Sequence, residues 1–390
     1  MIFFTVFTLV MGSAYLYVGK RLMGPWELAG GAQWAGWTVL FGHLAIVMSS
    51  FALMRLAGST VWARGLSWVA FVGMGLFSFL FIGVLFRDLG WSGLGLLERI
   101  IPGDVSLRTT DEGRRQFLFG AFNWALLAAT GVAGVVGVWS ARHVPGIKEV
   151  QVPLPGLPEA LQGYRIVQIT DLHVGPTIRE DYVRGVVDKI AQLDADMIAL
   201  TGDIVDGSPE DLEPLMQSLK TLKSKDGVYF CTGNHEYYSG VMRWCAAMKR
   251  LGMTVLNNAH AVIQRGDARI LVAGVTDYRA HTMVPSHASD PVAAVKDAPE
   301  CDVRLLLAHQ PKSCHAAVDV GFDLQISGHT HGGQIFPWNF LVPLAQPFTA
   351  GLHKLGQMWV YVSRGTGYWG PPMRVGAPSE ITLIRLISAD

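Results

Sequence analysis

Side chains that can bind metal ions recur in five short polar motifs in the second half of the 390-residue chain. In chain order the motifs are Asp171-Leu172-His173, Gly202-Asp203, Gly233-Asn234-His235-Glu236, His309 and Gly328-His329-Thr330-His331. A single Asp-x-His or Gly-Asp pair is also common in surface turns. Two imidazoles separated by one residue beside a glycine are a stronger indication of metal binding. Because the five motifs occur together in one chain, the sequence predicts a metal centre.

The predicted ligands define the chemistry that such a centre could perform. They are two aspartates, one asparagine and four histidines, namely Asp171, His173, Asp203, Asn234, His309, His329 and His331. This mixture of nitrogen and oxygen donors suits Mn, Fe or Zn and disfavours Mg or Ca. A carboxylate can bridge two ions about 3.5–4 Å apart, and such a pair can polarise a phosphoryl group and hold a hydroxide at neutral pH. Hydrolysis of a phosphate ester requires both.

Each motif directly follows an apolar run of the length of a buried strand. The predicted strands are Arg165–Thr170, Met197–Thr201, Val228–Cys231, Ile270–Val275, Val303–Ala308, Leu324–Ser327, Trp359–Ser363 and Ile381–Leu386. Helical patterns, such as Asp181–Leu193 and Leu212–Leu222, lie between some of them. This alternation predicts an α/β domain. The motifs lie at the C-terminal ends of its strands, where open α/β sheets place their ligand sites.

The overall composition excludes a wholly soluble protein. Half of the residues are hydrophobic and only 16% are charged, whereas roughly 25% are charged in an ordinary soluble domain. The surplus lies in four uncharged stretches, which are Ile2–Gly19, Trp34–Met54, Leu66–Phe86 and Phe117–Trp139. Each has about the length that a helix needs to cross a bilayer. The alternatives are buried core helices or, for the first stretch, a signal peptide. Soluble core helices seldom run so long without a charge, and Lys20 and Arg21 follow the first stretch rather than precede it.

We therefore predict a multi-pass integral protein of the cell membrane. Residues 1–143 would form a four-span α-helical bundle, residues 144–162 a linker and residues 163–390 the α/β domain. Lys and Arg in the flanks of the spans number seven on one side and four on the other. The positive-inside rule then places the α/β domain on the non-cytoplasmic side. The net charge of zero argues against a nucleic-acid partner.

The order of the motifs resembles that of the calcineurin-like metallophosphoesterase superfamily over roughly residues 163–388. The resemblance implies a β-sandwich flanked by helices. It also implies the role of each matching residue. Asp171, His173 and His331 would hold one ion, Asn234, His309 and His329 would hold the second, and Asp203 would bridge them. His235 would be the general acid that protonates the leaving oxygen, and Asp206 would orient His235.

The residues around the motifs are similar to those of the bacterial, membrane-associated branch of this superfamily. The segments concerned are DLHVGP, TGDIVDG, GNHEYY, SGHTHGGQ and YVSRGTG. Some members of that branch act on lipid-linked nucleotide diphosphates such as UDP-diacylglucosamine, and the N-terminal region is similar in architecture to transmembrane members. Arg364, in the last segment, is a candidate for binding a phosphate oxygen. A structural ion pair is the alternative role for this arginine.

The segment Pro337–Phe348 is unusually apolar for a stretch that directly follows a metal-binding motif. It could cover an acyl chain or touch a bilayer, or it could pack on the core of its own domain. Before that segment, His281 and His287 follow Asp277. We interpret both histidines as residues at the surface or at the rim of the site.

These observations lead to one main hypothesis and its alternatives. The chain is expected to be a membrane-anchored phosphoesterase with two transition-metal ions, acting on a phosphodiester or diphosphate bond of a phosphate-ester substrate. A lipid-linked substrate such as UDP-diacylglucosamine is one candidate. Membrane lipid is its expected partner. The alternatives are a phosphomonoesterase and a non-catalytic membrane sensor with a metal-bound ligand site. A transporter is disfavoured because the four stretches contain almost no polar groups.

Overall fold

A computed structural model describes residues 2–56, 60–101 and 106–389. The chain divides into two compact units, Met1–Val138 and Trp139–Asp390. Each unit is described by itself below.

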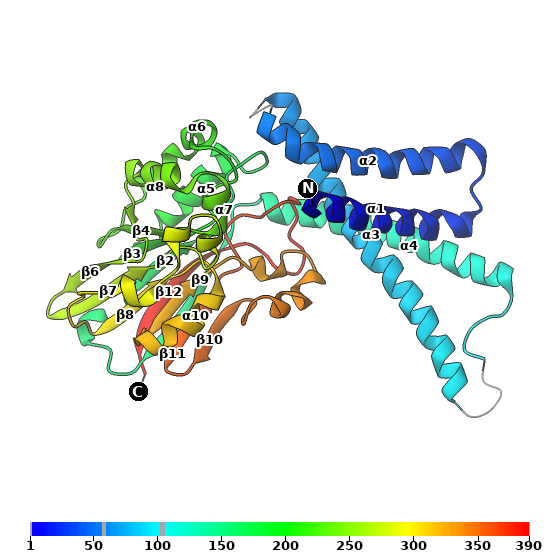
Figure 1. Ribbon diagram of the computed structural model, residues 1–390. Helices are drawn as coiled ribbons and strands as arrows, with labels where there is room; N and C mark the ends of the chain where they lie inside the picture. Colours follow the sequence, from blue (N-terminus) through cyan, green and yellow to red (C-terminus); the bar gives the residue numbers. More distant parts are fainter. Residues whose placement is uncertain (1, 57–59, 102–105, 390) are drawn as a thin grey trace. The chain divides into compact units, whose positions relative to one another are not determined.

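The first unit consists of long helices. They are α1 (Ile2–Met23), α2 (Gly30–Leu56), α3 (Val61–Ile100) and α4 (Glu112–Arg142), of which the last continues into the second unit (Figure 1). Tyr15 and Phe77 stack in the small core of this unit. His43 is bonded on both ring nitrogens, at 2.7 Å to the Tyr15 hydroxyl and at 3.2 Å to the Ala70 carbonyl. This histidine therefore has a structural role in helix packing.

The prediction of four membrane spans is supported for only two helices. Within the described residues, α3 and α4 are long and apolar enough to cross a membrane. The first and second predicted stretches, in α1 and α2, include residues 2–4 and 51–54, whose side chains lie outside the described part of the structure. The predicted third and fourth stretches are also parts of longer helices of 40 and 31 residues.

The second unit contains two mixed six-stranded sheets. The first sheet has the strand order β1 (Gly146–Leu154), β12 (Glu380–Ser388), β2 (Arg165–Ile169), β3 (Met197–Thr201), β4 (Val228–Cys231) and β5 (Thr254–Val255). The second has the order β10 (Gly351–Leu355), β11 (Met358–Val362), β9 (Leu324–Ser327), β8 (Val303–Leu307), β7 (Ala268–Gly274) and β6 (Ala259–Arg265). Strands β2 to β5 are parallel to one another, as are β7, β8, β9 and β11.

The two sheets pack face to face, and short helices cover their outer faces (Figure 1). Ile166 of β2 and Leu305 of β8 belong to the core between the sheets, whereas the next residue of β2, Val167, faces α5 (Glu180–Ile190) and α8 (Val241–Arg250). On the far side, α9 (Pro291–Ala294) and α10 (Cys314–Ala317) cover the second sheet. Burial on both faces explains why the central strands appear in the sequence as continuous apolar runs.

The eight predicted strands are present, but the structure differs from the sequence prediction at two other places. Residues 146–154, predicted as part of a linker, form β1, which pairs in parallel with β12 along its whole length. The predicted helix over residues 212–222 is mostly a 3₁₀-helix, Glu213–Thr221, after a single α-turn, α6 (Pro209–Leu212). Pro214 lies in the first turn of this 3₁₀-helix, where the missing N–H group of a proline is tolerated.

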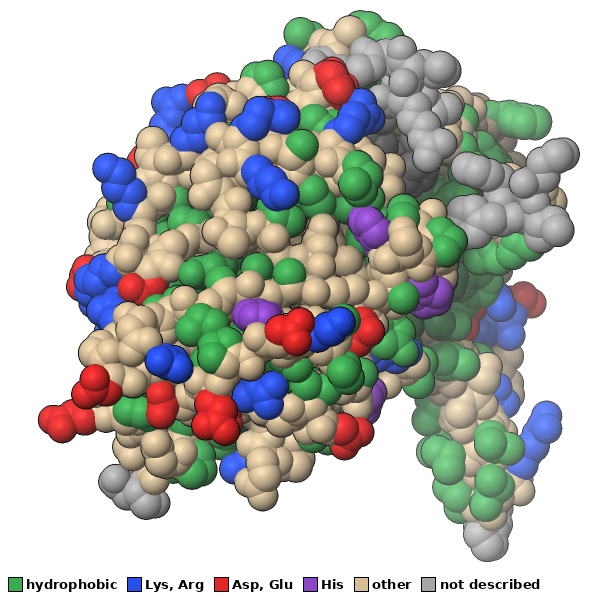
Figure 2. Space-filling view, turned by 60° about the vertical axis from the view of Figure 1, so that its left-hand side comes forward, with side chains coloured by type: hydrophobic (Ala, Val, Ile, Leu, Met, Phe, Trp, Pro, Cys, Tyr) green, Lys and Arg blue, Asp and Glu red, His purple; other side chains and the backbone are tan. Residues whose placement is uncertain are grey.

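The surface carries both signs of charge. Figure 2 shows basic and acidic side chains on the same face of the molecule. Arg243 and Glu210 form an exposed ion pair in the second unit. Exposed pairs of this kind add little to stability, because both partners remain solvated.

Candidate metal centre

The predicted ligands come together because the strands that carry them end at the same edge of the two sheets. Strands β2, β3 and β4 are parallel neighbours, and Asp171, Asp203 and Asn234 follow their C-terminal ends. His309 and His329 follow β8 and β9 of the second sheet, which are also parallel neighbours. The arrangement matches the expectation from strand order.

One cluster contains Asp171, His173 and His331. The Nε2 atoms of the two histidines lie 3.1 Å apart, and His331 Nε2 lies 3.4 Å from Asp171 Oδ1. All three side chains are buried. His173 Nδ1 donates to Asp206 Oδ1 at 3.1 Å, so its Nε2 is left as a lone-pair donor directed at the cluster.

A second cluster contains Asp203, His309 and His329. His309 Nε2 lies 3.0 Å from Asp203 Oδ2 and 3.2 Å from His329 Nδ1. His309 Nδ1 donates to the Thr201 carbonyl at 2.8 Å, which again directs Nε2 inward. Burial acts to raise the pKa of Asp203, but the neighbouring imidazoles, His309 first, hold it well below its usual value.

Asp203 lies where the two clusters meet, and Asn234 follows Gly233 in the next ligand motif. His173, Asp203 and His235 form a third group of possible ligand atoms, so Asp203 belongs to groups that contain members of both clusters. Asn234 Oδ1 is buried and has no hydrogen-bond partner within the described residues. A buried amide oxygen without a partner is costly, and a metal ion is one ligand that would satisfy it.

The spacing of the nitrogen atoms fits metal binding. Two atoms bound tetrahedrally to one zinc-like ion at about 2.0–2.1 Å lie about 3.3 Å apart. The His173–His331 and His309–His329 nitrogen pairs are 3.1 and 3.2 Å apart. His331 differs in one respect, because its Nδ1 faces a donor, Arg374 Nη2, at 3.1 Å. The neutral His331 ring would therefore carry its proton on Nε2, and an ion bound there would displace it.

The backbone at the ligands is not that of an extended strand. Asp171 and His173 both have φ near +52°. Three further ligands share this left-handed conformation, at φ values of +53°, +72° and +52°: Asp203, His329 and His331. Left-handed backbone is unfavourable for residues other than glycine. The ligands thus occupy tight turns that begin where each strand ends.

Two glycines of the motifs are required by space. A Cβ atom at Gly233 would lie 2.2 Å from Asp203 Oδ1, and one at Gly328 would lie 2.1 Å from Asp171 Oδ2. Both distances are far shorter than any real contact of a Cβ atom. These glycines therefore allow one ligand loop to pass directly over the carboxylate of another.

His235 lies beside the clusters and is paired with Asp206. Its Nδ1 is 2.5 Å from Asp206 Oδ1, and its Nε2 is 3.9 Å from Asp203 Oδ2. Burial acts to lower the pKa of His235, but the carboxylates of Asp203 and Asp206 outweigh it and raise the pKa to about 9. Burial acts to raise the pKa of Asp206, but the imidazoles of His173 and His235 outweigh this effect and lower the pKa. The pair is arranged to keep a proton on an imidazole next to the clusters.

Comparison with known proteins identifies the family of the chain. The family model described as calcineurin-like phosphoesterase matches residues 164–333. A Danio rerio protein named "Transmembrane protein with metallophosphoesterase domain" is 33% identical over 397 residues, which cover 98% of this chain and 87% of the relative. The chain belongs to the calcineurin-like metallophosphoesterase family. That family uses divalent metal ions.

Other relatives of this metallophosphoesterase match about two thirds of its chain. An uncharacterised metallophosphoesterase of Helicobacter pylori strain J99 is 40% identical over 253 residues, 64% of this chain and 66% of that protein. A Bos taurus transmembrane protein with a metallophosphoesterase domain is 36% identical over 271 residues, 67% of this chain and 61% of that protein. The chain thus spans slightly less than two thirds of these two relatives.

Glu236 is a residue of the metallophosphoesterase site whose role sequence reasoning missed. Its fully buried carboxylate accepts three backbone N–H groups, from Gly233 at 2.7 Å, Asp203 at 2.9 Å and Ile204 at 2.8 Å. Burial, followed by the nearby Asp203, raises its pKa to about 7. Glu236 therefore ties the loop after β3 to the loop after β4. Its position in the motif was visible, but nothing in the sequence indicates which N–H groups it would meet.

Replacing Glu236 with alanine should destabilise the second unit by at least about 3 kcal/mol. The reason is that three buried N–H groups lose their acceptor at a cost of about 1–3 kcal/mol each. Glu236→Gln, which keeps one carbonyl oxygen, should lose less. Urea unfolding followed by circular dichroism would measure both. Equal stability of wild type and Glu236→Ala would contradict this role.

Arg374 is the other residue that the sequence did not reveal. It is almost fully buried, and its guanidinium donates to the carbonyls of His331, Gly367 and Ala377 as well as facing His331 Nδ1. Burial is the main cause that lowers its pKa, to about 10. This arginine fixes the orientation of His331. It lies 43 residues downstream of that histidine, outside every motif, so no local pattern pointed to it.

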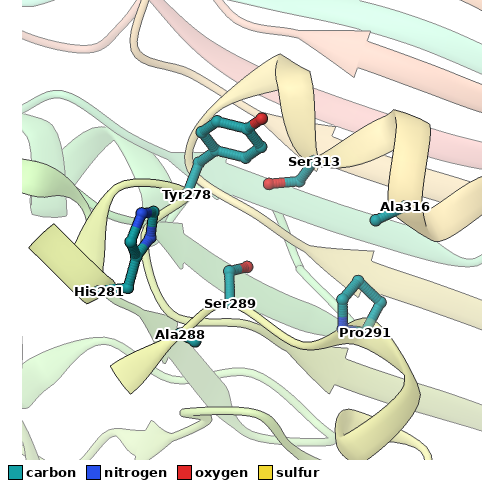
Figure 3. Close-up of a pocket in the computed structure, with 7 residues that line it drawn as sticks. All are labelled: Tyr278, His281, Ala288, Ser289, Pro291, Ser313 and Ala316. Carbon is teal, nitrogen blue, oxygen red and sulfur yellow. The ribbon is translucent and has the colours of Figure 1, made fainter. Parts of the chain in front are cut away.

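The remaining candidates lie at different distances from the clusters. Arg364 packs against the turn that carries His331, since its Cγ lies 2.9 Å from where a Cβ atom of Gly332 would be. His287 is bonded to the Tyr237 hydroxyl at 2.9 Å. His281 lines a separate hollow of about 240 Å³ beside Tyr278 and Ser313 (Figure 3). The structure does not bring His281 or His287 into the groups of possible metal ligands.

Proposed function

We propose that the protein is a membrane-anchored phosphoesterase with a dinuclear metal centre, which hydrolyses a phosphodiester or diphosphate bond of a lipid-linked substrate. The observation that carries the proposal is the sharing of Asp203 between neighbouring ligand groups, with His235 and Asp206 beside it. In this proposal Asp171, His173 and His331 hold one ion, and Asn234, His309 and His329 hold the other. Mn, Fe or Zn suits these donors.

The residues around the ions would each have a distinct task. Bound divalent ions supply Lewis-acid stabilisation of the phosphoryl oxygens and a nucleophile at neutral pH. His235 donates a proton from Nε2 to the leaving oxygen, while Asp206 accepts from Nδ1 and stabilises the protonated ring. Asp206 also accepts from His173, so one carboxylate orients a ligand and the general acid together. Arg364 would bind a phosphate oxygen.

The membrane part of the proposal is supported by two helices, α3 and α4, that are long and apolar enough to span a bilayer. If all four predicted stretches cross the bilayer, their flanks carry seven Lys and Arg residues on one side and four on the other, which favours a phosphoesterase domain on the non-cytoplasmic side. An enzyme anchored in this way works close to lipids. A lipid-linked diester or diphosphate, such as UDP-diacylglucosamine, is therefore the substrate class that we propose.

The test is hydrolysis by the full chain, purified in detergent and loaded with Mn²⁺. We expect bis-p-nitrophenyl phosphate to be cleaved with a kcat/KM at least tenfold above that of p-nitrophenyl phosphate. Chelation should abolish turnover, and Mn²⁺, Fe²⁺ or Zn²⁺, but not Ca²⁺, should restore it. Preference for the monoester would indicate a phosphomonoesterase instead. Bound metal without turnover of either compound would contradict the proposal and favour a sensor.

A further inference from the structure

Large apolar side chains form an exposed rim beside the metal centre. The rim consists of Phe336, Phe340, Leu341, Leu344 and Trp369, each at least half exposed, with Leu344 84% and Phe340 67% exposed. Phe340, Leu341 and Leu344 belong to the apolar segment Pro337–Phe348, and their exposure shows that these three side chains do not pack on the core of the domain. Soluble proteins rarely keep such a cluster in water, and it usually marks a contact site.

The rim is joined to the site by backbone and side-chain contacts. Gly333, two residues after His331, lies so close to the rim loop that a Cβ atom there would be 2.3 Å from the Cα of Asn339. The Gln334 amide exchanges hydrogen bonds with Trp369, at 2.8 and 2.9 Å, and so links the two segments of the rim. The Trp369 ring centre is 5.6 Å from that of His235. The rim thus borders the proposed general acid.

The same side of the second unit receives the end of the candidate membrane helix α4. Ala141, in its last turn, is fully buried in the core of this unit. Arg142 donates to the Thr177 carbonyl at 3.0 Å, and Tyr368, the neighbour of Trp369, donates to that same carbonyl at 3.2 Å. Only residues 143–145 separate α4 from β1. Three residues reach at most about 10 Å, so this side of the unit cannot lie far from the end of α4.

We propose that the rim is a bilayer-contacting surface, which places the metal centre at the level of the lipid headgroups. The occupant is the boundary between headgroups and acyl chains. Phe and Trp side chains suit that boundary, because it is apolar on one side and hydrated on the other. The proposal extends the proposed function. One consequence, the access of a lipid-attached phosphate to the ions, rests on that function. A phosphate attached to a lipid can reach the ions while its acyl chain remains in the membrane.

The first experiment measures membrane contact without catalysis. Leu344→Cys is labelled with an environment-sensitive fluorophore in the full chain, reconstituted in nanodiscs whose acyl chains carry a nitroxide quencher. Cys231, Cys245 and Cys314 are buried, and the partly exposed Cys301 is replaced by serine in all variants. Val262→Cys on the edge strand β6 is the matched control, since this valine is an exposed apolar residue outside the rim. We expect at least twofold quenching at position 344 and none at 262. No quenching at 344, or equal quenching at both positions, would overturn the proposal.

The second experiment uses hexadecyl p-nitrophenyl phosphate in vesicles and soluble ethyl p-nitrophenyl phosphate, which share one leaving group. We expect wild type to prefer the long-chain ester at least tenfold in kcat/KM. Leu344→Ser and Phe340→Ser should remove that preference and leave the ethyl ester unaffected within twofold, because both side chains project into solvent. An unchanged preference in the variants would overturn the proposal. Quenching at position 344 without hydrolysis of either ester would uphold the surface and sink the proposed function.

Discussion

Asp203→Asn should reduce kcat for bis-p-nitrophenyl phosphate by on the order of 10³-fold and lower the bound metal from two ions towards one. Asparagine keeps the shape of the side chain and one oxygen. That oxygen can still accept the backbone N–H of His235, which now bonds Asp203 Oδ1 at 2.8 Å. It loses the negative charge and the second oxygen that would bridge two ions. Removing one preorganised electrostatic contact from an active site typically costs 10²–10³-fold, and here an ion is expected to be lost as well. The measurements are steady-state kinetics and metal content by mass spectrometry.

Asp319→Asn is the matched control, because Asp319 is an exposed aspartate on the 3₁₀-helix Val318–Val320, outside the groups of possible ligands. Its activity and metal content should equal those of wild type. If Asp203→Asn retained two ions and more than about a tenth of the activity, Asp203 would not be the bridging ligand, and the dinuclear proposal would fail.

His235→Ala should lower kcat by about 10²–10⁴-fold, the usual contribution of a general acid, while both ions remain bound. The size of the loss should depend on the leaving group. A p-nitrophenolate leaves readily without a proton, so the loss should be at the lower end for bis-p-nitrophenyl phosphate. It should be at the upper end for an alkyl phosphodiester, whose alkoxide must be protonated as it leaves. Kinetics on the two esters, with metal analysis, check this prediction.

His315→Ala, at an exposed histidine on α10, is the control for the loss of an imidazole. It should behave as wild type on both esters. An equal loss on both esters in His235→Ala would contradict the role of general acid. Loss of metal from that variant would instead make His235 a ligand, as its place in a group with His173 and Asp203 allows.

The sequence could predict the part of the site that depends on the buried strands and on the ligand motifs that follow them. Each ligand motif follows an apolar run, and burial of both sheet faces made those runs continuous and easy to recognise. The four edge strands β1, β5, β6 and β10 were missed for the opposite reason. They keep many partly or fully exposed residues, so their composition does not differ from that of loops.

The part that could not be predicted depends on contacts between distant residues. The sequence does not indicate the backbone conformation of Asp171 and His173, because the turn that follows β2 is left-handed at both residues although neither is a glycine. Arg374 reaches His331 through folding alone. Of the four predicted membrane spans, two, in α3 and α4, are supported within the described residues.

The left-handed turns at the ligands have a consequence for how this chain can evolve. Five ligands adopt a conformation that costs about 1–2 kcal/mol per residue, which together is comparable with the whole free energy of unfolding of an ordinary domain, about 5–15 kcal/mol. Glycine adopts the same conformation without that cost. Glycine would nevertheless remove contacts together with the strain, because the carboxylate of Asp171 accepts the His329 backbone N–H and that of Asp203 accepts the His235 backbone N–H. A mutation to glycine would relax the backbone and leave a donor without its acceptor, so greater stability cannot be reached at these positions by one simple exchange.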